Sequence, residues 1–563
     1  MVHSRFGIVK RTLLLFFIAS VQFGFGQSAD YPLNHPAYSI SDYWAAKGST
    51  NIFTKFKPYS RRKTIELLKG QELTQKVQKF NGNYLFQDSR EWSGDSTRSK
   101  KSMGRFLEYP ADFYAAKTKG FDLHVNPVVH LRVGQDSRSS ATLYENNRGL
   151  ELRARIDDRI AIYTMLSENQ TQFPAYVNDV RDSVGSIPQE GFWKLFGGSG
   201  SDMFRAEGYV DVGVTAHVSV QMGYGRHFIG DGQRSLMLSD FGNRYPYIKI
   251  ETEVWRIKYT NLFAQLVGEA DYFPGGTLGS TEFPQKFMTM HHLDINVTDN
   301  LNIGLFESVI FGEPDSLGGG VKFQYLNPII FYRALEQQDG SPDNVLIGMD
   351  FNWHLWNRVT LYGQLVIDEM VIKEVFNNQG WWGNKQGVQL GAKYFDAFGV
   401  SNLMLQGEFN GVRPYMYAHE DGFTNYSNYN LPLAHPLGAN FKEVIGKVDF
   451  QPLDKWRFQA VGVFAKFGDD LNGRNYGRDI LRSYNDRDLN NNGLADDDYG
   501  NDFLQGEQGS LVMANFRATY QWKPNVFVDG DFILRKETGQ SASQSTIFGL
   551  SFRWNFPERF YLF

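Results

Sequence analysis

Residues Val512–Trp522 read VMANFRATYQW, and every second residue of this stretch is apolar. The even-numbered positions hold Val, Ala, Phe, Ala, Tyr and Trp, and after Met513 the positions between them hold Asn, Arg, Thr and Gln. Successive side chains of a β-strand point to opposite faces of a sheet. The stretch is therefore predicted to be a strand with one apolar and one polar face.

The same alternation recurs along much of the chain. It is present in VDVGVTAHVSVQMGY (Val210–Tyr224), which we interpret as one strand, and in VLIGMDFNWHL (Val345–Leu355). About eighteen such segments follow one another from FDLHVNPVVHLRV, which begins at Phe121, to the chain end. An even number in this range is typical of single-chain bacterial outer-membrane barrels.

A soluble β-sandwich would show the same alternation, but three further features favour a membrane barrel. The segments are close to the 9–11 residues that cross a bilayer at a tilt. The last stretch, STIFGLSFRWNFPERFYLF (Ser545–Phe563), resembles the C-terminal strand by which outer-membrane barrels are recognised for assembly. Its apolar face is predicted to hold Phe548, Leu550, Phe552, Trp554 and Phe556.

Tryptophans are the third feature, because they gather at the predicted strand ends as aromatic girdles do at the two membrane interfaces. They are Trp255, Trp353, Trp456, Trp522 and Trp554. We predict an all-β fold, a transmembrane antiparallel β-barrel of about 18 strands with an N-terminal segment that is helical or irregular and plugs the lumen or lies in the periplasm.

The N-terminus and the composition place the chain in an export pathway. MVHSRFGIVKR is basic and TLLLFFIASVQFGFG is apolar, so residues 1–26 are predicted to be a signal peptide. The absence of cysteine excludes disulfides and thiolate metal sites. A net charge of -5 gives no electrostatic support for a nucleic-acid partner.

The predicted division of the chain has four parts. They are the signal peptide (1–26), an N-terminal periplasmic or plug region (27–119), the barrel (120–556) and a C-terminal tail (557–563). In the second part, Ser60 is a candidate helix cap ahead of apolar positions that indicate one or two short helices. Those positions are Ile65, Leu67, Leu68 and Val77.

Connections between the predicted strands are of two lengths, which fits short periplasmic turns and long outer loops. The long ones are Asn169–Asp202, Phe311–Asn344, Asp368–Gly387, Asn410–Phe441 and Gly468–Gly509. The predicted inward face mixes positive and negative side chains, and such charges tend to pair and fill a lumen. We also expect GRHFIGDGQRSLMLSD, with Arg226 and Arg234, to fold into the barrel and pair with lumen acids, in preference to forming a phosphate site.

Several stretches resemble outer-membrane proteins of the Wzi capsule-assembly type, including RemB-like members linked to gliding motility. They occur in order between the N-terminal region and Glu443, and they read HPAYSISDYW, FKPYSRRK, GYGRHFIGDGQRSLMLSDFGNRYPYIKI, WRIKYTNLFAQL, HHLDINVTDNLNIGLFESVIFG, YLNPIIFYRALEQQDGSPDNVLIGMD and NYSNYNLPLAHPLGANFKE. The resemblance implies an 18-stranded barrel occluded on its periplasmic side by N-terminal helices. It also implies a lectin-like role at the cell surface or, for the gliding-linked members, a role in adhesion or movement.

Two aromatic, amide-rich loops are candidate glycan sites. Trp381 and Trp382 lie in FNNQGWWGNKQG, where exposed rings could stack on sugars or anchor the chain at the membrane interface. The second loop, RPYMYAHEDGFTNYSNYN, has the same two interpretations. Its aromatic residues are Tyr415, Tyr417, Tyr426 and Tyr429.

NDRDLNNNGLADDDYGND (Asn485–Asp502) follows the start of a calcium loop, with oxygen ligands at alternate positions before a glycine. The candidate ligands of a structural calcium ion are Asp488, Asn490, Asn492, Asp496 and Asp498. A solvated acidic loop with Asn-Gly turns is the alternative. No cofactor is expected to be required.

The functional hypothesis is an outer-membrane barrel that binds, retains or organises surface polysaccharide without turning it over, because no nucleophile elbow or metalloprotease helix occurs in the sequence. One alternative is a surface component of gliding motility or adhesion that works through protein partners, and another is a solute channel. The expected partners are membrane lipid, polysaccharide and, during insertion, the β-barrel assembly machinery. The expected location is the outer membrane, with loops on the cell surface.

Overall fold

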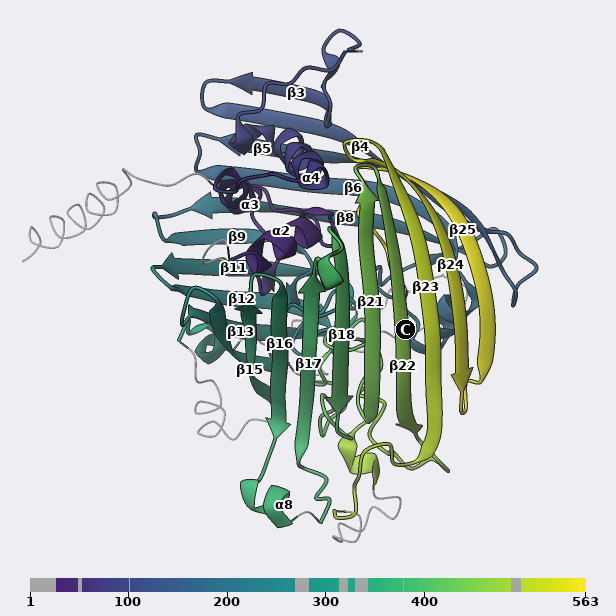
Figure 1. Ribbon diagram of the computed structural model, residues 1–563. Coiled ribbons are helices and arrows are strands. Elements are labelled where there is room, and N and C mark those ends of the chain that lie inside the picture. The colour runs from purple at the N-terminus through teal and green to yellow at the C-terminus, as the bar shows by residue number, and fades with distance from the viewer. Residues whose placement is uncertain are drawn as a thin grey trace, which may run out of the picture.

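The chain forms a closed β-barrel with helices at one end of its lumen (Figure 1). The structure is a computed structural model that describes residues 27–48, 53–100, 102–268, 283–312, 322–329, 343–377, 379–487 and 498–563. The predicted signal peptide lies outside these ranges. Within them, no helix combines the length and the apolar character that a membrane-spanning helix needs.

Eighteen antiparallel strands form the barrel, as the alternation predicts. Pairing of β25 with β4, from Trp554↔Val129 to Ile547↔Asp136, closes the sheet. The strands are β4 (Phe121–Asp136), β5 (Leu143–Ile156), β6 (Ile160–Gln172), β8 (Gly200–Gly213), β9 (Val218–Gly225), β11 (Tyr245–Val254), β12 (Ile257–Val267), β13 (Gln285–Asn296), β14 (Leu301–Phe311), β15 (Asn344–Leu355), β16 (Val359–Glu369), β17 (Lys385–Phe395), β18 (Leu403–Val412), β21 (Phe441–Leu453), β22 (Trp456–Asp469), β23 (Glu507–Lys523), β24 (Val526–Thr538) and β25 (Ser543–Trp554).

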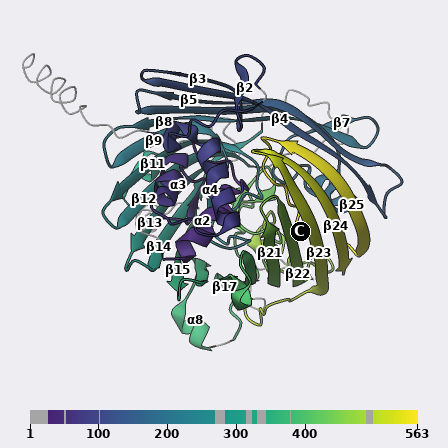
Figure 2. The same cartoon turned by 45° about the horizontal axis from the view of Figure 1, so that its top comes forward.

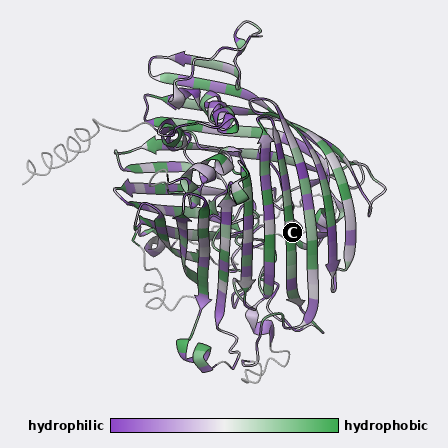
Figure 3. Cartoon of the chain, viewed as in Figure 1, coloured by the Kyte–Doolittle hydropathy of each residue, from purple (hydrophilic) through white to green (hydrophobic). Residues whose placement is uncertain are grey.

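Apolar side chains of these strands face outward and polar ones face the lumen, so hydropathy alternates along each strand in Figure 3. On β23, Phe516 is 49% exposed whereas the adjacent Asn515 is 3% exposed. The outer surface is the one that contacts hydrocarbon in a membrane barrel. The alternation in the sequence is therefore the alternation between lipid and lumen.

The segment Val210–Tyr224 is not one strand, and this prediction was wrong. β8 ends at Gly213 and β9 begins at Val218, and a turn joins them. Val210 lies opposite Met222 in the antiparallel pair, and both point outward. The turn has an even number of residues, so every second residue stays apolar from one strand through the turn to the next. Periodicity alone therefore cannot detect the turn.

The two ends of the barrel differ as predicted, with short turns at one end and long connections at the other. All five predicted long connections join consecutive barrel strands at the same end. The connections between β9 and β11 and between β12 and β13 were not predicted to be long, and they lie at this end as well. The five predicted girdle tryptophans all lie at the short-turn end. Four of them are exposed, and Trp554 is half-buried.

The chain end differs from the expectation of a single apolar face. β25 stops at Trp554, and Phe556 is buried in the lumen instead of facing lipid. Residues 555–563 turn inward, where the Tyr176 hydroxyl donates to the Tyr561 carbonyl at 2.8 Å. Asn555 at the turn adopts a positive φ, which allows the sharp reversal.

Three segments of the chain lie inside the barrel, as Figure 2 shows for the N-terminal helices. The first contains α2 (Ala37–Ala46), α3 (Arg61–Lys69), α4 (Lys76–Asp88) and α5 (Arg90–Ser93), with Ser60 capping α3 as predicted. The second is the β9–β11 connection, whose strand β10 (Phe228–Ile229) pairs with β1 (Phe56–Lys57). The third is the C-terminal tail.

Smaller elements complete the fold. β2 (Phe106–Tyr109) and β3 (Asp112–Thr118) form a hairpin that extends the sheet along β4, so strand pairing begins before residue 120. The long connections contain the remaining elements. These are α6 (Ala175–Val184), β7 (Lys194–Phe196), η1 (Phe323–Leu326), α8 (Ile372–Asn377), β19 (Ser427–Asn428), β20 (Leu431–Pro432) and η3 (Tyr484–Arg487), whereas η2 (Ala397–Gly399) lies in the β17–β18 turn.

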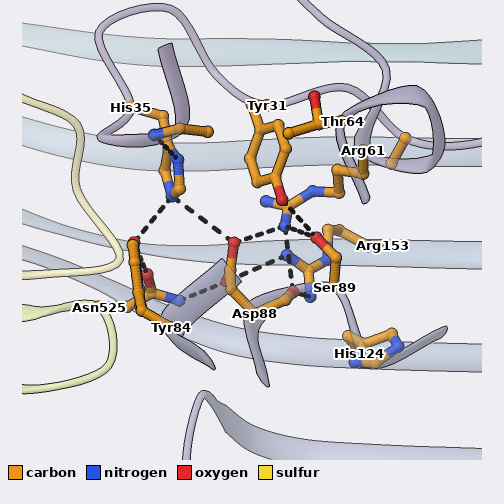
Figure 4. Close-up of polar contacts among 12 residues, drawn as sticks. Tyr31, His35, Arg61, Thr64, Tyr84, Asp88, Ser89, His124, Arg153 and Asn525 are labelled. Atoms are coloured by element: carbon orange, nitrogen blue, oxygen red, sulfur yellow. Dashed lines mark hydrogen bonds and ion pairs between the residues drawn. The ribbon is translucent and has the colours of Figure 1, made fainter. Parts of the chain in front are cut away.

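Asp88 fastens the N-terminal helices to the barrel wall (Figure 4). Its carboxylate accepts from Arg61 Nη1 and from Asn525 Nδ2, both at 2.6 Å, and lies 3.7 Å from Arg153 Nη1. Burial alone would raise the pKa of Asp88, but Arg61 and Arg153 outweigh it and hold the pKa well below its usual range. The buried acid is therefore ionised, and it joins α3 and α4 to β5 and the β23–β24 turn.

The outward orientation of Phe516 can be tested by Phe516→Arg. We expect this change to lower the free energy of unfolding by about 2–4 kcal/mol, because it places a cation near the middle of the lipid-facing surface. Urea-dependent unfolding from lipid vesicles, followed by tryptophan fluorescence, measures the change. Phe516→Leu is the matched control, and equal effects of the two variants would contradict a lipid-facing position.

Candidate functional site

The long connections bring an aromatic group together at their end of the barrel. We call Trp381, Trp382, Lys385, Tyr484 and Arg487 the loop-end cluster. The first two precede β17 and Lys385 is its first residue, whereas the other two form the ends of η3 between β22 and β23. Sequence reasoning identified only the tryptophans, because nothing in the sequence relates positions about a hundred residues apart.

Trp382 is the centre of the loop-end cluster. Its ring centroid lies 6.0 Å from that of Trp381 and 4.7 Å from that of Tyr484. The Arg487 guanidinium lies over it at 3.9 Å, and the Lys385 ammonium lies 5.2 Å from its centroid. Trp381 and Trp382 are both half-buried.

Backbone pairing between two connections holds the cluster in place. Trp382 N donates to Asp498 O at 2.8 Å, and Asn501 N donates to Gly380 O at 2.8 Å. Gly380 has a φ of 68°, and a Cβ there would lie 2.8 Å from Asn501 N. Glycine is needed at this position because a side chain would separate the two connections.

The cations of the cluster are already paired with acids. Lys385 Nζ lies 3.4 Å from Asp368 and 3.5 Å from Glu369, and Arg487 Nη2 lies 2.9 Å from Asp498. The local charge is therefore close to balanced. A ligand would meet aromatic faces and hydrogen-bonding groups here, without a strong net field.

Three of the four candidate tyrosines have packing roles instead of exposed positions. Tyr415, Tyr417 and Tyr426 are fully buried. Their hydroxyls donate to the carbonyls of Asn475, Leu236 and Met237, the first at 3.1 Å and the others at 2.8 Å. This corrects the expectation of an open aromatic loop, because the 413–440 connection folds inward and packs against the β9–β11 connection.

Tyr429 is the fourth candidate and is half-buried. Burial raises the pKa of Tyr429 to about 12, as it does for Tyr415. Both phenols are thus neutral at physiological pH. Tyr429 remains a predicted sugar contact, separate from the loop-end cluster.

Most of the predicted calcium ligands, Asp488, Asn490, Asn492 and Asp496, lie outside the described residues. Asp498 is described, and its carboxylate pairs with Arg487. A calcium ion would compete with that arginine for the carboxylate. Calcium binding stays a prediction.

A different group has the composition of a metal site. The ligand atoms of His292, Asp294 and Asp350 lie within 4.8 Å of one another and are buried on the lumen side. Lys55 of the N-terminal segment places its ammonium against Asp350 and 3.7 Å from Asp294. The position that a cation would take is thus filled by a side chain of the same protein, so this group anchors the N-terminal segment.

The β9–β11 connection folds into the lumen as predicted. Arg234 Nη2 lies 3.0 Å from Glu443 on β21, and the backbone N–H of Arg234 donates to Glu408 on β18. Arg226 instead donates to the carbonyl of Asp240 within the same connection. The predicted pairing with lumen acids is confirmed for Arg234 only.

These features can be compared with solved structures. The chain is similar to Wzi, an outer-membrane protein involved in group 1 capsule assembly in Escherichia coli and described as a carbohydrate-binding β-barrel. The TM-score is 0.58 at 13% identity, over 94% of this chain and 100% of that one. The fold is that of an outer-membrane β-barrel.

Lower similarity extends to two proteins of Pseudomonas aeruginosa. OprD matches with a TM-score of 0.41 at 11% identity over 78% of this chain and 97% of that chain, and OccK8 (OprE) matches with 0.43 at 7% identity over 77% and 98%. At such identities the similarity concerns the fold alone. No family model and no curated protein matches the sequence.

The packing role of the tyrosines predicts a loss of stability without a loss of binding. Tyr417→Phe and Tyr426→Phe each leave a buried carbonyl without its donor, so we expect each to lower the free energy of unfolding by about 1–3 kcal/mol. Thermal unfolding followed by circular dichroism measures this effect. Tyr429→Phe is the control, because its hydroxyl makes no hydrogen bond to any described residue. Weaker polysaccharide binding by folded Tyr417→Phe protein would contradict the packing role.

The anchoring role of Lys55 predicts that Lys55→Met loosens the N-terminal segment. The change removes the lysine from Asp294 and Asp350 and leaves these buried acids with His292 alone, a loss of up to about 3–5 kcal/mol. Limited proteolysis of the segment should become much faster. Lys63→Met is the control, because Lys63 pairs with Glu253 at an exposed site where the expected cost is below about 1 kcal/mol. Equal protection in both variants would show that Lys55 does not anchor the segment.

Proposed function

We propose that this barrel retains or organises surface polysaccharide at its long-connection end, without chemical turnover. The observation that carries the proposal is the loop-end cluster, where two neighbouring tryptophans and Tyr484 converge from different connections. Aromatic rings pack on the apolar C–H faces of sugars, and nearby polar groups fix the orientation of a ligand.

Charge balance indicates what part of a polysaccharide this end would contact. Lys385 and Arg487 each have a carboxylate partner, so neither supplies an unshared charge. The cluster therefore suits sugar rings and hydroxyls more than isolated acidic groups. Retention of a long polymer does not need a tight single site, because several weak contacts along one chain add through effective concentration.

The segments of the chain inside the lumen favour retention over solute passage. Lys55, Asp88 and Arg234 each tie an inner segment of the chain to the wall through buried charged contacts. A solute would have to displace these segments. The similarity in fold to Wzi, which is described as carbohydrate-binding, also supports polysaccharide retention over solute passage.

A second candidate function, adhesion or gliding through protein partners, is favoured by α8. This short helix follows β16 at the long-connection end and exposes apolar side chains, with Phe376 83% exposed. Apolar side chains gathered on an outer protrusion are typical of protein contacts. The exposed group comprises Met370, Val371, Ile372, Val375 and Phe376.

The test compares cell-bound with shed polysaccharide. We expect cells with the Trp381→Ala, Trp382→Ala double variant to make polysaccharide normally and to shed several-fold more of it into the medium. Trp356→Ala is the matched control, because Trp356 is an exposed tryptophan at the short-turn end. Unchanged retention in the double variant, at equal amounts of folded barrel, would contradict the proposal. Motility and adhesion assays of a Phe376→Ser strain then test the second candidate.

A further inference from the structure

A cavity of about 290 Å³ lies inside the barrel at the short-turn end. One wall is α2, and the other consists of β17, β18, β21 and β22. The β9–β11 connection and the C-terminal tail close its inner end, and the exposed Lys455 of the β21–β22 turn stands at its outer rim. The volume is at the lower limit of small-molecule sites, and no residue of the loop-end cluster lines it.

A row of polar side chains crosses the strand wall of this cavity. Lys393 on β17 is paired in register with Gln406 on β18, which is paired in turn with Lys447 on β21. Two residues after Lys447 on β21, Asp449 is paired in register with Gln459 on β22. Cross-strand neighbours lie about 5 Å apart, so the row presents a continuous polar surface.

Lys447 is a positive charge without a carboxylate partner among the described residues. Its ammonium makes one hydrogen bond there, to Gln233 Oε1 at 3.4 Å. The acids nearest in the row are taken, since Asp449 accepts from Arg457 Nε at 2.7 Å and Lys393 holds Asp42 at 2.6 Å.

The remaining lining acids are engaged as well. Three of them pair with cations outside the lining, and two accept from side-chain amides. The pairs are Asp396 with Lys47, Asp454 with Lys76, Glu558 with Arg553, Asp231 with Asn352 and Asp240 with Asn34. Lys447 is half-buried, and a cation without a carboxylate partner can make a charge-assisted hydrogen bond to an anionic ligand.

Gln459 adds an unsatisfied acceptor to the same wall. Its side chain is 6% exposed, and its Nε2 donates to Asp449 at 3.2 Å. Its Oε1 is buried and has no donor among the described residues. Buried acceptors without a donor are rare and costly. This oxygen is enclosed within the wall, and the hydroxyls of a ligand would instead meet the amides of Gln233, Gln406 and Gln451, which line the cavity.

We propose that the cavity binds a small hydroxylated anion, a sugar acid or sugar phosphate, that enters from the short-turn end. Lys447 pairs with its anionic group, and the amides of Gln233, Gln406 and Gln451 bond its hydroxyls. Outer-membrane barrels place short turns in the periplasm, so this ligand is met on the opposite side from surface polysaccharide. The site is independent of the loop-end cluster and of the function proposed for it.

Isothermal titration of the full-length barrel in detergent tests the site with sodium D-glucuronate and D-glucose 6-phosphate. Acetate and D-glucose are the controls, since the first lacks hydroxyls and the second lacks charge. We expect glucuronate or glucose 6-phosphate to bind about tenfold more tightly than either control. Lys447→Gln should weaken that binding about tenfold or more, and Lys447→Arg should retain it.

Matched variants separate this site from other effects. Lys442→Gln changes an outward-facing lysine on the same strand and should leave binding unchanged. The proposal is overturned if neither glucuronate nor glucose 6-phosphate binds at about 10 mM. It is also overturned if acetate binds equally well. Both results are obtained with the unmodified protein, so neither requires a folded variant. Undiminished binding in Lys447→Gln also overturns it.

Discussion

Every peptide group that faces hydrocarbon needs a hydrogen-bond partner within the protein, since an unpaired one costs several kcal/mol in lipid. The pairing of β25 with β4 meets this requirement for the last two strand edges. Closure in turn fixes an inside and an outside for every strand. Asn515 faces the lumen and the adjacent Phe516 faces outward, and side chains alternate in this way on every strand of the closed sheet.

Closure also creates a lumen, and three segments of the chain lie inside it. The polar inner face brings charges out of bulk water, where an unpaired charge is expensive. Ion pairs between the inner segments and the barrel wall offset this cost, and they are made by Asp88, Lys55 and Arg234. The pairs are specific because each joins residues that only the folded barrel brings together. Lys447 on the strand wall of the cavity has no carboxylate partner among the described residues, and this is what suggests a ligand.

The two ends of the molecule have different chemistry. At the long-connection end, aromatic rings gather around Trp382 with their neighbouring cations neutralised. At the short-turn end, a polar cavity keeps an uncompensated lysine. The first suits the faces of sugar rings in a polymer, and the second suits a small charged ligand. The two groups of residues lie at opposite ends of the same barrel.

Periodicity by itself determined the barrel fold, the approximate number of strands, the lipid-facing side and five of the long connections, because these depend on the local pattern of side chains. It could not detect the turn between Val210 and Tyr224, whose even length leaves the pattern intact. It also assigned Phe556 to lipid, although the chain reverses one residue earlier. Tertiary structure alone decided that Tyr417 and Tyr426 are buried and that Arg487 stacks on Trp382. Those outcomes depend on contacts between distant segments, and barrel closure decides which segments meet.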